Sequence, residues 1–348
     1  MTTDAQPAPA GGQWQPKLCE NVPDVSDQTL RWAAQLGLQA LALPGRVADP
    51  EGKGYWTAEA CQAVADKLRP YGLEVGIMML HVSPSIVLGR PGRDEAIEDV
   101  QRSIRAAASA GYPVLEYNFY NHRAVEGYGR RPGRGGAVYT DYDDTRLQAL
   151  APLPEVGQPT AAETWEHLEY FLRAVVPAAE GAGVRLAVHP NDPPPPTSRG
   201  AAQVLHNLEG MKRLVELVPS PANGITLCQG SFCEWPGMDI VAAIHHFGSR
   251  DKIHHVHYRN PRGTFPSYVE PFLDEGDTDM FLAMKAYRDV NYRFTLCSDH
   301  VPHLTDDLAF GLIGRAYNHG YIKAMIQAVN HLPPTPPNPL APRGSEGE

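Results

Sequence analysis

The sequence predicts an α/β fold of the (β/α)8, or TIM-barrel, class, and three observations lead to this prediction. An amphipathic helix, a glycine and a short apolar run recur together, as in DQTLRWAAQLG followed by LQALAL. The apolar runs are continuous, which is typical of parallel strands buried on both faces. Successive glycines, Gly37, Gly72 and Gly111, are separated by the length of one strand and one helix. Such regular alternation favours a parallel sheet covered by helices.

The helices are predicted from apolar residues at three- and four-residue spacing, as Leu168, Phe171 and Val175 show in HLEYFLRAVVPAAEGAG. The glycine that follows each helical run, such as Gly183, suits the left-handed residue where a helix ends. Because crossovers between parallel strands are right-handed, few arrangements other than a barrel remain. The eight expected strands lie at about 18–21, 38–43, 73–80, 113–119, 184–189, 224–228, 252–258 and 293–298.

A long inserted loop is expected after the fourth strand, because the next helix and glycine are delayed. Its residues, about 120–160, are rich in Gly, Arg, Tyr and Pro. It contains Arg130, Arg131 and Arg134, so it could be a lid over an anionic substrate or an exposed basic segment. A doubly wound open sheet is the alternative fold, but no GxGxxG motif follows the first strand.

Composition limits the class of protein. We expect one catalytic barrel domain over 13–332, with disordered termini at 1–12 and 333–348, where Ala, Pro, Gly and polar residues dominate. The formal charge of -10 argues against nucleic acid or an anionic membrane surface as partner. The N-terminus lacks the features of a signal peptide, and five cysteines without a CxxC pair fit a reducing, cytoplasmic location. The oligomeric state stays open, with a homo-oligomer as one outcome.

Four of the expected strands end on a residue that can bind a metal ion. His189 follows RLAV, Cys228 ends GITL, His257 ends IHHV and Asp299 follows FTLC. The carboxyl ends of parallel strands open on one rim of a barrel, so these side chains should converge. Imidazole, thiolate and carboxylate together suit Mn, Fe, Co or Zn. Arg259, on the same strand face as His257, could hold a substrate carboxylate or hydroxyl or be a solvated arginine.

The motifs around these residues resemble those of the mannonate dehydratases. AVHPNDPP, NGITLCQGS, HHVHYRN, EGDTDM and CSDH carry the resemblance, together with the YNF at 117–119, in segments from about 111 to 326. The resemblance implies a xylose-isomerase-like TIM barrel that removes water from D-mannonate to give 2-keto-3-deoxy-D-gluconate. It also implies a divalent ion, usually manganese. The implied ligands are His189, Cys228, His257 and Asp299, and the implied acid/base residue is His300.

The chain departs from the family pattern in several places. Ser298–Val301 reads SDHV where the family has PDHG, and Phe310 aligns with a tyrosine that takes part in proton transfer. The histidine-containing HExxHL element is VEPFLD here, which leaves Glu270, and Glu116 replaces a cysteine before YNF. The stretch after YNF is unrelated to the family's.

We expect Glu116 to take over the tyrosine's role as a base, with His122 as the second candidate for it. Asn118, His122 and Arg259 are the expected substrate contacts. A pairing of Glu116 with an arginine such as Arg259 is the alternative. Three hypotheses follow: a metal-dependent hydro-lyase acting on a sugar acid, an isomerase, epimerase or other lyase using the same ion, and a barrel that binds a sugar acid without turnover.

Overall fold

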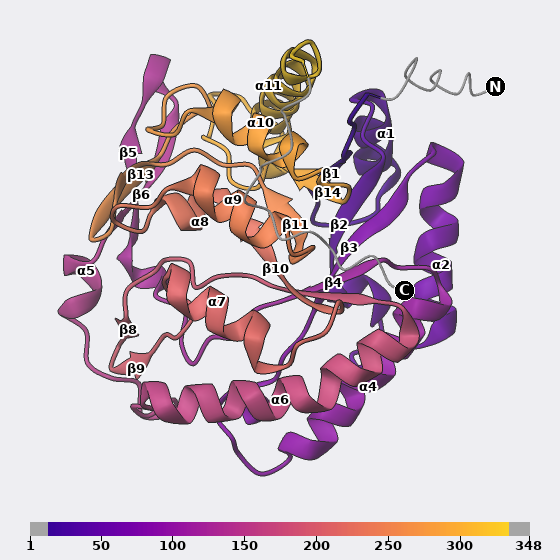
Figure 1. The fold of residues 1–348 in the computed structure, drawn as a ribbon, viewed down its shortest axis with the longest axis vertical. Helices are drawn as coiled ribbons and strands as arrows, with labels where there is room; N and C mark the ends of the chain where they lie inside the picture. Colours follow the sequence, from indigo (N-terminus) through magenta and orange to yellow (C-terminus); the bar gives the residue numbers. More distant parts are fainter. Residues whose placement is uncertain (1–12, 334–348) are drawn as a thin grey trace, which may run out of the picture.

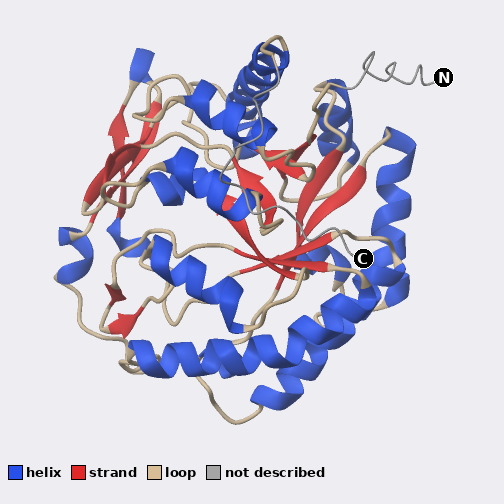
Figure 2. Ribbon diagram, in the orientation of Figure 1, coloured by secondary structure: helices blue, strands red, loops and turns tan. Residues whose placement is uncertain are grey.

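The computed structural model describes residues 13–333, in which eight parallel strands close into a barrel (Figures 1 and 2). The strand order around the barrel is β1-β14-β11-β10-β7-β4-β3-β2, so each barrel strand lies beside the previous and the next one along the chain. The TIM-barrel class and the eight predicted strands are therefore confirmed. The strands are β1 (Lys17–Asn21), β2 (Ala40–Pro44), β3 (Glu74–Leu80), β4 (Val114–Tyr117), β7 (Arg185–Val188), β10 (Asn223–Cys228), β11 (Ile253–His257) and β14 (Thr295–Cys297).

Helices surround the strands, as Figure 2 shows in blue. Their starts follow from side-chain caps: Thr160 and Glu163 form a reciprocal capping box on α6. The predicted glycine stops are present, with φ of 69° at Gly72 and 70° at Gly183. The longer helices are α1 (Asp27–Gln35), α2 (Ala58–Leu68), α4 (Arg93–Ser109), α6 (Ala161–Ala182), α7 (Leu208–Leu217), α9 (Ile240–Gly248), α10 (Met280–Asp289) and α11 (Leu312–Asn330); α3 (Pro84–Val87), α5 (Thr145–Gln148) and α8 (Gln229–Cys233) are short.

The core has two parts, one outside and one inside the strands. The larger part packs strand residues such as Leu41 and Met78 against the helices. The inner part is built from small side chains, including Ala40, Ala42 and Ala187. Gly76 belongs to this tight interior, since a Cβ there would lie 2.8 Å from the Cβ of Ala40. A filled interior leaves the carboxyl ends of the strands as the place for a cavity.

The insertion after β4 is present, but its description as a loop is corrected. It contains β5 (Tyr128–Pro132) and β6 (Val138–Asp143), which join β12 (Arg262–Thr264) and β13 (Ser267–Glu270) in an antiparallel sheet of order β12-β13-β6-β5. Figure 1 shows β5, β6 and β13 at the left, beside the barrel. Buried Tyr139 and Tyr142 anchor the hairpin, and β13 brings Glu270 to the barrel rim. A two-stranded sheet of two short strands, β8 (Thr197–Ser198) and β9 (Ala201–Ala202), lies after β7.

Two predictions concern the chain ends and membranes. The terminal segments expected to be disordered, 1–12 and 333–348, lie outside the described residues except for Pro333. Among the helices of residues 13–333, none combines the length and the apolar character that a membrane span requires.

Candidate metal centre and active site

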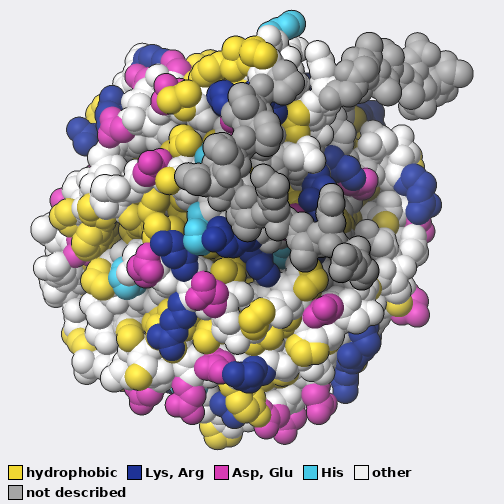
Figure 3. Space-filling model, viewed as in Figure 1, with side chains coloured by type: hydrophobic (Ala, Val, Ile, Leu, Met, Phe, Trp, Pro, Cys, Tyr) yellow, Lys and Arg dark blue, Asp and Glu magenta, His cyan; other side chains and the backbone are white. Residues whose placement is uncertain are grey.

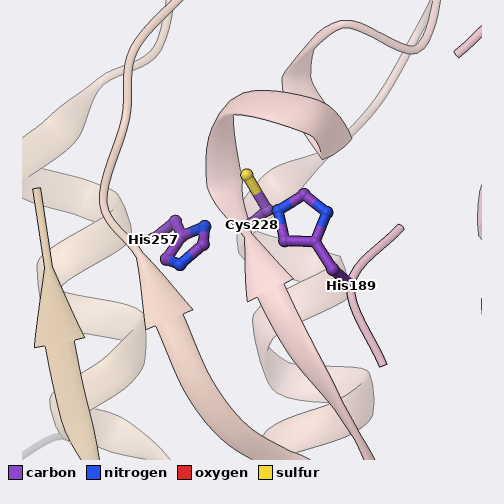
Figure 4. Close-up of side chains that lie close together, drawn as sticks. All are labelled: His189, Cys228 and His257. Carbon is purple, nitrogen blue, oxygen red and sulfur yellow. The ribbon is translucent and has the colours of Figure 1, made fainter. Parts of the chain in front are cut away.

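Three of the four predicted ligands lie together at neighbouring strand ends. His189 follows β7, Cys228 ends β10 and His257 ends β11, and their donor atoms all lie within 4.8 Å of one another. Cys228 and His257 are partners in the parallel register, which sets them side by side. Figure 4 shows the two imidazole rings on either side of the sulfur, and the ring centroids are 5.2 Å apart. All three residues are buried.

The chemistry of this group fits a divalent metal ion. Both ring nitrogens of His257 are buried without a hydrogen-bond partner, an unusual state for a buried polar atom. The Nδ1 of His189 contacts the carbonyl oxygen of Pro190 at 2.7 Å, which leaves Nε2 as the free donor atom. Burial alone would raise the pKa of the Cys228 thiol, but Arg259 and His189 lower that pKa well below its usual value. The group therefore offers two imidazole nitrogens and a thiolate.

Asp299 adjoins this group without belonging to the closest set of donor atoms. It follows β14 in a left-handed conformation with φ of 59°. Its Oδ2 lies 3.5 Å from the Nδ1 of His257 and 3.3 Å from the Nε of Arg259. Burial would raise the pKa of Asp299, but His300, His257 and Arg259 lower it well below its usual value. Its place beside His257 is what the sequence predicted for the fourth ligand, but its carboxylate is not among the three donors that lie within 4.8 Å of one another.

A second group of donor atoms, formed by His255, His257 and Cys297, shares His257 with the first. The Nδ1 of His255 is taken by the hydroxyl of Thr295 at 2.7 Å. Burial raises the pKa of the Cys297 thiol well above its usual value, and nearby Glu20 raises it further. A neutral thiol is a poor ligand, so the first group is the better metal site.

A cavity lies next to the metal group, which consists of the three predicted ligands His189, Cys228 and His257. It has a volume of about 330 Å³ and opens at the carboxyl ends of the strands. Its lining includes five residues for which the sequence predicted a role in catalysis or metal binding: Glu116, His189, His257, Asp299 and His300. Asn118, a predicted substrate contact, also lines it, whereas Cys228 is not among the lining residues. The complete lining is Asn21, Val22, Pro23, Ala42, Leu43, Pro44, Arg46, Ile77, Met79, Glu116, Asn118, Tyr120, Arg123, His189, Asp192, His257, Asp299, His300 and Phe310.

Glu116 is a buried carboxylate on the cavity wall. It accepts a hydrogen bond from the hydroxyl of Thr226 at 2.7 Å, and its Oε1 lies 3.9 Å from the Nε2 of His257. Among the described residues, no arginine lies within 4 Å of the Glu116 carboxylate, and Arg259 pairs with Asp192 instead. The alternative of a Glu116–arginine pair is therefore not what the structure contains.

Arg259 does not line the cavity, contrary to the expectation that it contacts substrate. It is buried behind the wall, with 2% exposure. Its guanidinium lies 2.6 Å from Asp192 and 3.3 Å from Glu234, and it also pairs with Glu270. Arg259 therefore neutralises a cluster of buried carboxylates and supports the Cys228 thiolate, whose sulfur is 3.5 Å from Nη2.

His122 also lies outside the lining. Its Nδ1 is 2.8 Å from the hydroxyl of Ser198, and its Nε2 is 3.4 Å from Glu126. Two of the three arginines singled out in the insertion have other contacts: Arg134 pairs with Asp274 at 2.7 Å, and Arg130 lines a neighbouring cavity. The basic loop is thus fixed to its own small sheet rather than folded over the metal group.

His300 stands between the two cavities and lines both. Its Nδ1 lies 2.9 Å from Glu270, and its Nε2 lies 3.8 Å from Asp299. Burial would lower the pKa of His300, but Asp299 and Glu270 raise it above its ordinary value. Phe310, which also lines both cavities, is 43% exposed and has φ of 66°.

Sequence reasoning missed Arg123, which lines the cavity from the insertion. Its Nε donates to the carbonyl oxygen of Asp192 at 2.7 Å, and its guanidinium lies over the ring of Tyr120. Its place in FYNHR, four residues after the YNF at 117–119, was the available signal. Figure 3 shows Lys, Arg and His side chains gathered near the middle of one face, a local positive charge on an acidic chain.

The fold and the grouped donor atoms define a TIM-barrel enzyme with a candidate metal site at the carboxyl ends of its strands. The family model described as D-mannonate dehydratase (UxuA) matches residues 142–333. A mannonate dehydratase from Thermotoga maritima is 30% identical over 316 residues, covering 80% of this chain and 87% of the relative. The chain belongs to the D-mannonate dehydratase family and is an enzyme of the lyase class.

Solved structures agree with this family. The crystal structure of mannonate dehydratase from Streptococcus suis serotype 2 superimposes with a TM-score of 0.82 at 28% identity, covering 91% of this chain and 94% of that one. A xylose isomerase domain protein from Alicyclobacillus acidocaldarius shares the fold alone, with a TM-score of 0.63 at 13% identity and coverage of 91% and 99%.

Proposed function

We propose that this chain is a metal-dependent hydro-lyase that converts a sugar acid, D-mannonate or a related aldonate, into the 2-keto-3-deoxy acid. The observation that carries the proposal is the convergence of His189, Cys228 and His257 beside a cavity in a member of the D-mannonate dehydratase family. Neither ring nitrogen of His257 has a hydrogen-bond partner among the described residues, and a metal ion would occupy one of them.

His189, Cys228 and His257 would hold the ion, with Asp299 as the fourth ligand. Manganese is the first candidate, and iron, cobalt and zinc are alternatives, because a mixed thiolate, imidazole and carboxylate set does not select one metal. When bound, the ion supplies Lewis acidity toward the carboxylate and 2-hydroxyl of the substrate, which favours loss of the proton on C2.

Glu116 is the proposed base for the C2 proton, since a buried carboxylate on the wall faces the same cavity as the donor atoms. His300 is the proposed acid, with its Nδ1 held by Glu270 and its ring on the cavity. The C2 proton goes to Glu116, the C3–O bond breaks, and His300 supplies the proton with which the hydroxyl leaves as water. The resulting enol takes a proton at C3 and becomes the ketone.

Arg123 is the proposed contact for the substrate carboxylate, in place of Arg259. Its Nε is held by Asp192, and no described carboxylate side chain pairs with its two terminal nitrogens. A guanidinium fixed at one nitrogen and free at two suits bidentate recognition of a carboxylate. Asn118 is the proposed partner for a hydroxyl, because its amide reaches the cavity.

An isomerase or epimerase is the second candidate. Two proton-carrying groups, Glu116 and His300, line one cavity, which is what proton removal and return at a single carbon requires. A barrel that binds a sugar acid without turnover is the third hypothesis, in which the same three residues would hold a metal ion that only binds the ligand.

The test is product formation by protein loaded with Mn²⁺ and incubated with D-mannonate and a panel of other aldonates and uronates. We expect a metal-dependent 2-keto-3-deoxy acid that disappears after chelation and returns when Mn²⁺ is restored. Exchange of the C2 proton with solvent, without any 2-keto acid, would replace the dehydratase by the isomerase. Ligand binding with neither exchange nor product would leave the third hypothesis.

A further inference from the structure

We propose that the substrate carries its hydroxyls near the carboxylate and is deoxygenated at the far end: a 2,3-dihydroxy acid with an aliphatic tail. This inference rests on the proposed function and specifies its substrate class. It comes from the wall of the main cavity that faces the metal group. That wall presents Ala42, Pro44, Ile77 and Met79, whose side chains carry no hydrogen-bond donor and no oxygen or nitrogen acceptor.

The barrel order sets this apolar wall opposite the metal ligands. Counting around the closed ring, β2 lies four strands from β10, and β3 lies four strands from β11. Ala42 and Pro44 belong to β2, and Ile77 and Met79 to β3. A molecule that reaches a metal ion at Cys228 and His257 therefore extends its other end across the mouth toward β2 and β3.

Alternation along β2 and the core clusters agree with this arrangement. Leu41 packs with the outer core, whereas Ala42 belongs to the cluster inside the barrel. Ile77 belongs to the inner cluster too. Val22 and Pro23, which follow β1, and Phe310 extend the apolar lining at the rim. The polar lining residues come mainly from β4 onward.

One cation, Arg46, stands at the edge of this wall. It is exposed, and its Nη2 donates to the carbonyl oxygen of Pro23 at 2.6 Å. Asn21 lies toward Asp299 at one side of the wall and Asn118 toward Met79 at the other. Between them, Ala42, Pro44 and Ile77 offer no partner for a hydroxyl. Hydroxyls that lose water against Ala42, Ile77 and Met79 would remain unpaired, whereas methylene and methyl groups gain from leaving water.

The first experiment compares three acids that share one configuration at C2 and C3: D-mannonate, 6-deoxy-D-mannonate and the 4,5,6-trideoxy analogue. Dehydration by the Mn²⁺-loaded protein gives kcat/KM, and calorimetric titration gives binding independently of turnover. We expect kcat/KM to rise along this series, with the trideoxy acid preferred to D-mannonate by about tenfold or more, the range that apolar pockets achieve.

The second experiment changes the wall. Met79→Gln keeps the size of the side chain roughly constant and Ile77→Thr shortens it by one carbon. Both add a hydrogen-bonding group, so each should shift the kcat/KM ratio toward D-mannonate by about tenfold. Met325→Gln is the matched control: Met325 is also half-buried, but it lies on α11 and lines none of the cavities described. It should leave the ratio unchanged even if it lowers stability.

The outcomes separate this inference from the proposed function. Preference for D-mannonate over the trideoxy acid by about tenfold or more would overturn the apolar-end inference and leave the dehydratase intact. Tighter binding of the trideoxy acid without any dehydration would support the inference and overturn the dehydratase. Failure of all three acids to bind the metal-loaded protein would overturn both. A wall variant whose ratio matches that of Met325→Gln would also count against the inference.

Discussion

The Oε1 of Glu116 lies 3.9 Å from the Nε2 of His257, and both side chains are buried at the ends of β4 and β11. The same carboxylate oxygen accepts a hydrogen bond from Thr226, which fixes its direction. In the proposed function this carboxylate acts as the base on a molecule bound at His189, Cys228 and His257. Phe310, which the sequence resemblance aligns with a family tyrosine, has a phenyl ring that cannot exchange a proton.

Glu116→Gln should therefore reduce turnover of the preferred acid by about 10²–10⁴-fold, the contribution typical of a general base. The amide keeps the shape of the side chain, so metal content should stay the same by elemental analysis. Glu98→Gln, an exposed change on α4, is the matched control and should keep full activity. Turnover at the parent rate, or loss of metal with the turnover, would count against the role of Glu116 as base.

His189→Ala and Asp299→Ala should each reduce the bound divalent ion, because each removes one proposed ligand. Elemental analysis after dialysis against Mn²⁺ measures the effect, and His331→Ala, an exposed histidine beyond α11, is the control. The loss should be larger for His189, whose donor atom lies in the closest group. If both variants retain as much metal as the parent, the ligand assignment is wrong.

Arg259→Met should destabilise the fold by about 3–5 kcal/mol, because it leaves buried charges without their partner. Arg259 is the shared cation of Asp192, Glu234 and Glu270, each of which is buried. The free energy of unfolding in denaturant measures the effect. Arg31→Met, at an exposed pair with Asp27, should change stability little. A cost for Arg259→Met as small as that of the control would show that the cluster does not depend on this arginine.

Glu20 gives a pH dependence of stability whose sign can be derived. Burial alone would raise the pKa of this carboxyl, but Arg315 and His319 lower it from 4.5 to about 2. A carboxyl with a lower pKa in the folded state binds its proton more tightly when unfolded. The ionised Glu20 therefore adds about 3 kcal/mol to the free energy of unfolding. This stabilisation is complete above pH 4.5 and is lost as the pH falls toward 2.

The difference in free energy of unfolding between the parent and Glu20→Gln should consequently shrink as the pH is lowered through this window. Denaturant titrations at several pH values between about 6 and 2.5 measure this difference. Glu98→Gln, measured in parallel, should show almost no such trend. A difference that stays constant over the whole range would contradict the depressed pKa of Glu20.

Much of the fold could be predicted from the sequence because its signals are local. Gly72 and Gly183 occupy the left-handed stops that the helix pattern required. The metal group could be predicted because His189, Cys228 and His257 end apolar runs, and parallel strand ends share a rim. Both predictions need only the order of elements along the chain.

The rest depends on contacts between distant segments. The hairpin of β5 and β6 forms because it pairs with β13, more than 100 residues later along the chain, and the Gly- and Arg-rich composition concealed the buried Tyr139 and Tyr142. The burial of Arg259 is fixed by acidic side chains from three separate segments, Asp192 after β7, Glu234 at the end of α8 and Glu270 on β13, which no spacing in the sequence reveals. The same holds for Arg123, whose position follows from its contact with Asp192.

The most direct test of the account is the fate of solvent deuterium when the Mn²⁺-loaded protein acts on its preferred acid in D₂O. Removal of the C2 proton and loss of the C3 hydroxyl give an enol that takes its new hydrogen at C3 from solvent. The account predicts a 2-keto-3-deoxy acid with one deuterium at C3, formed only with metal and lost in Glu116→Gln. Product formation that persists in Glu116→Gln at about 1 per second or faster on D-mannonate itself would contradict it.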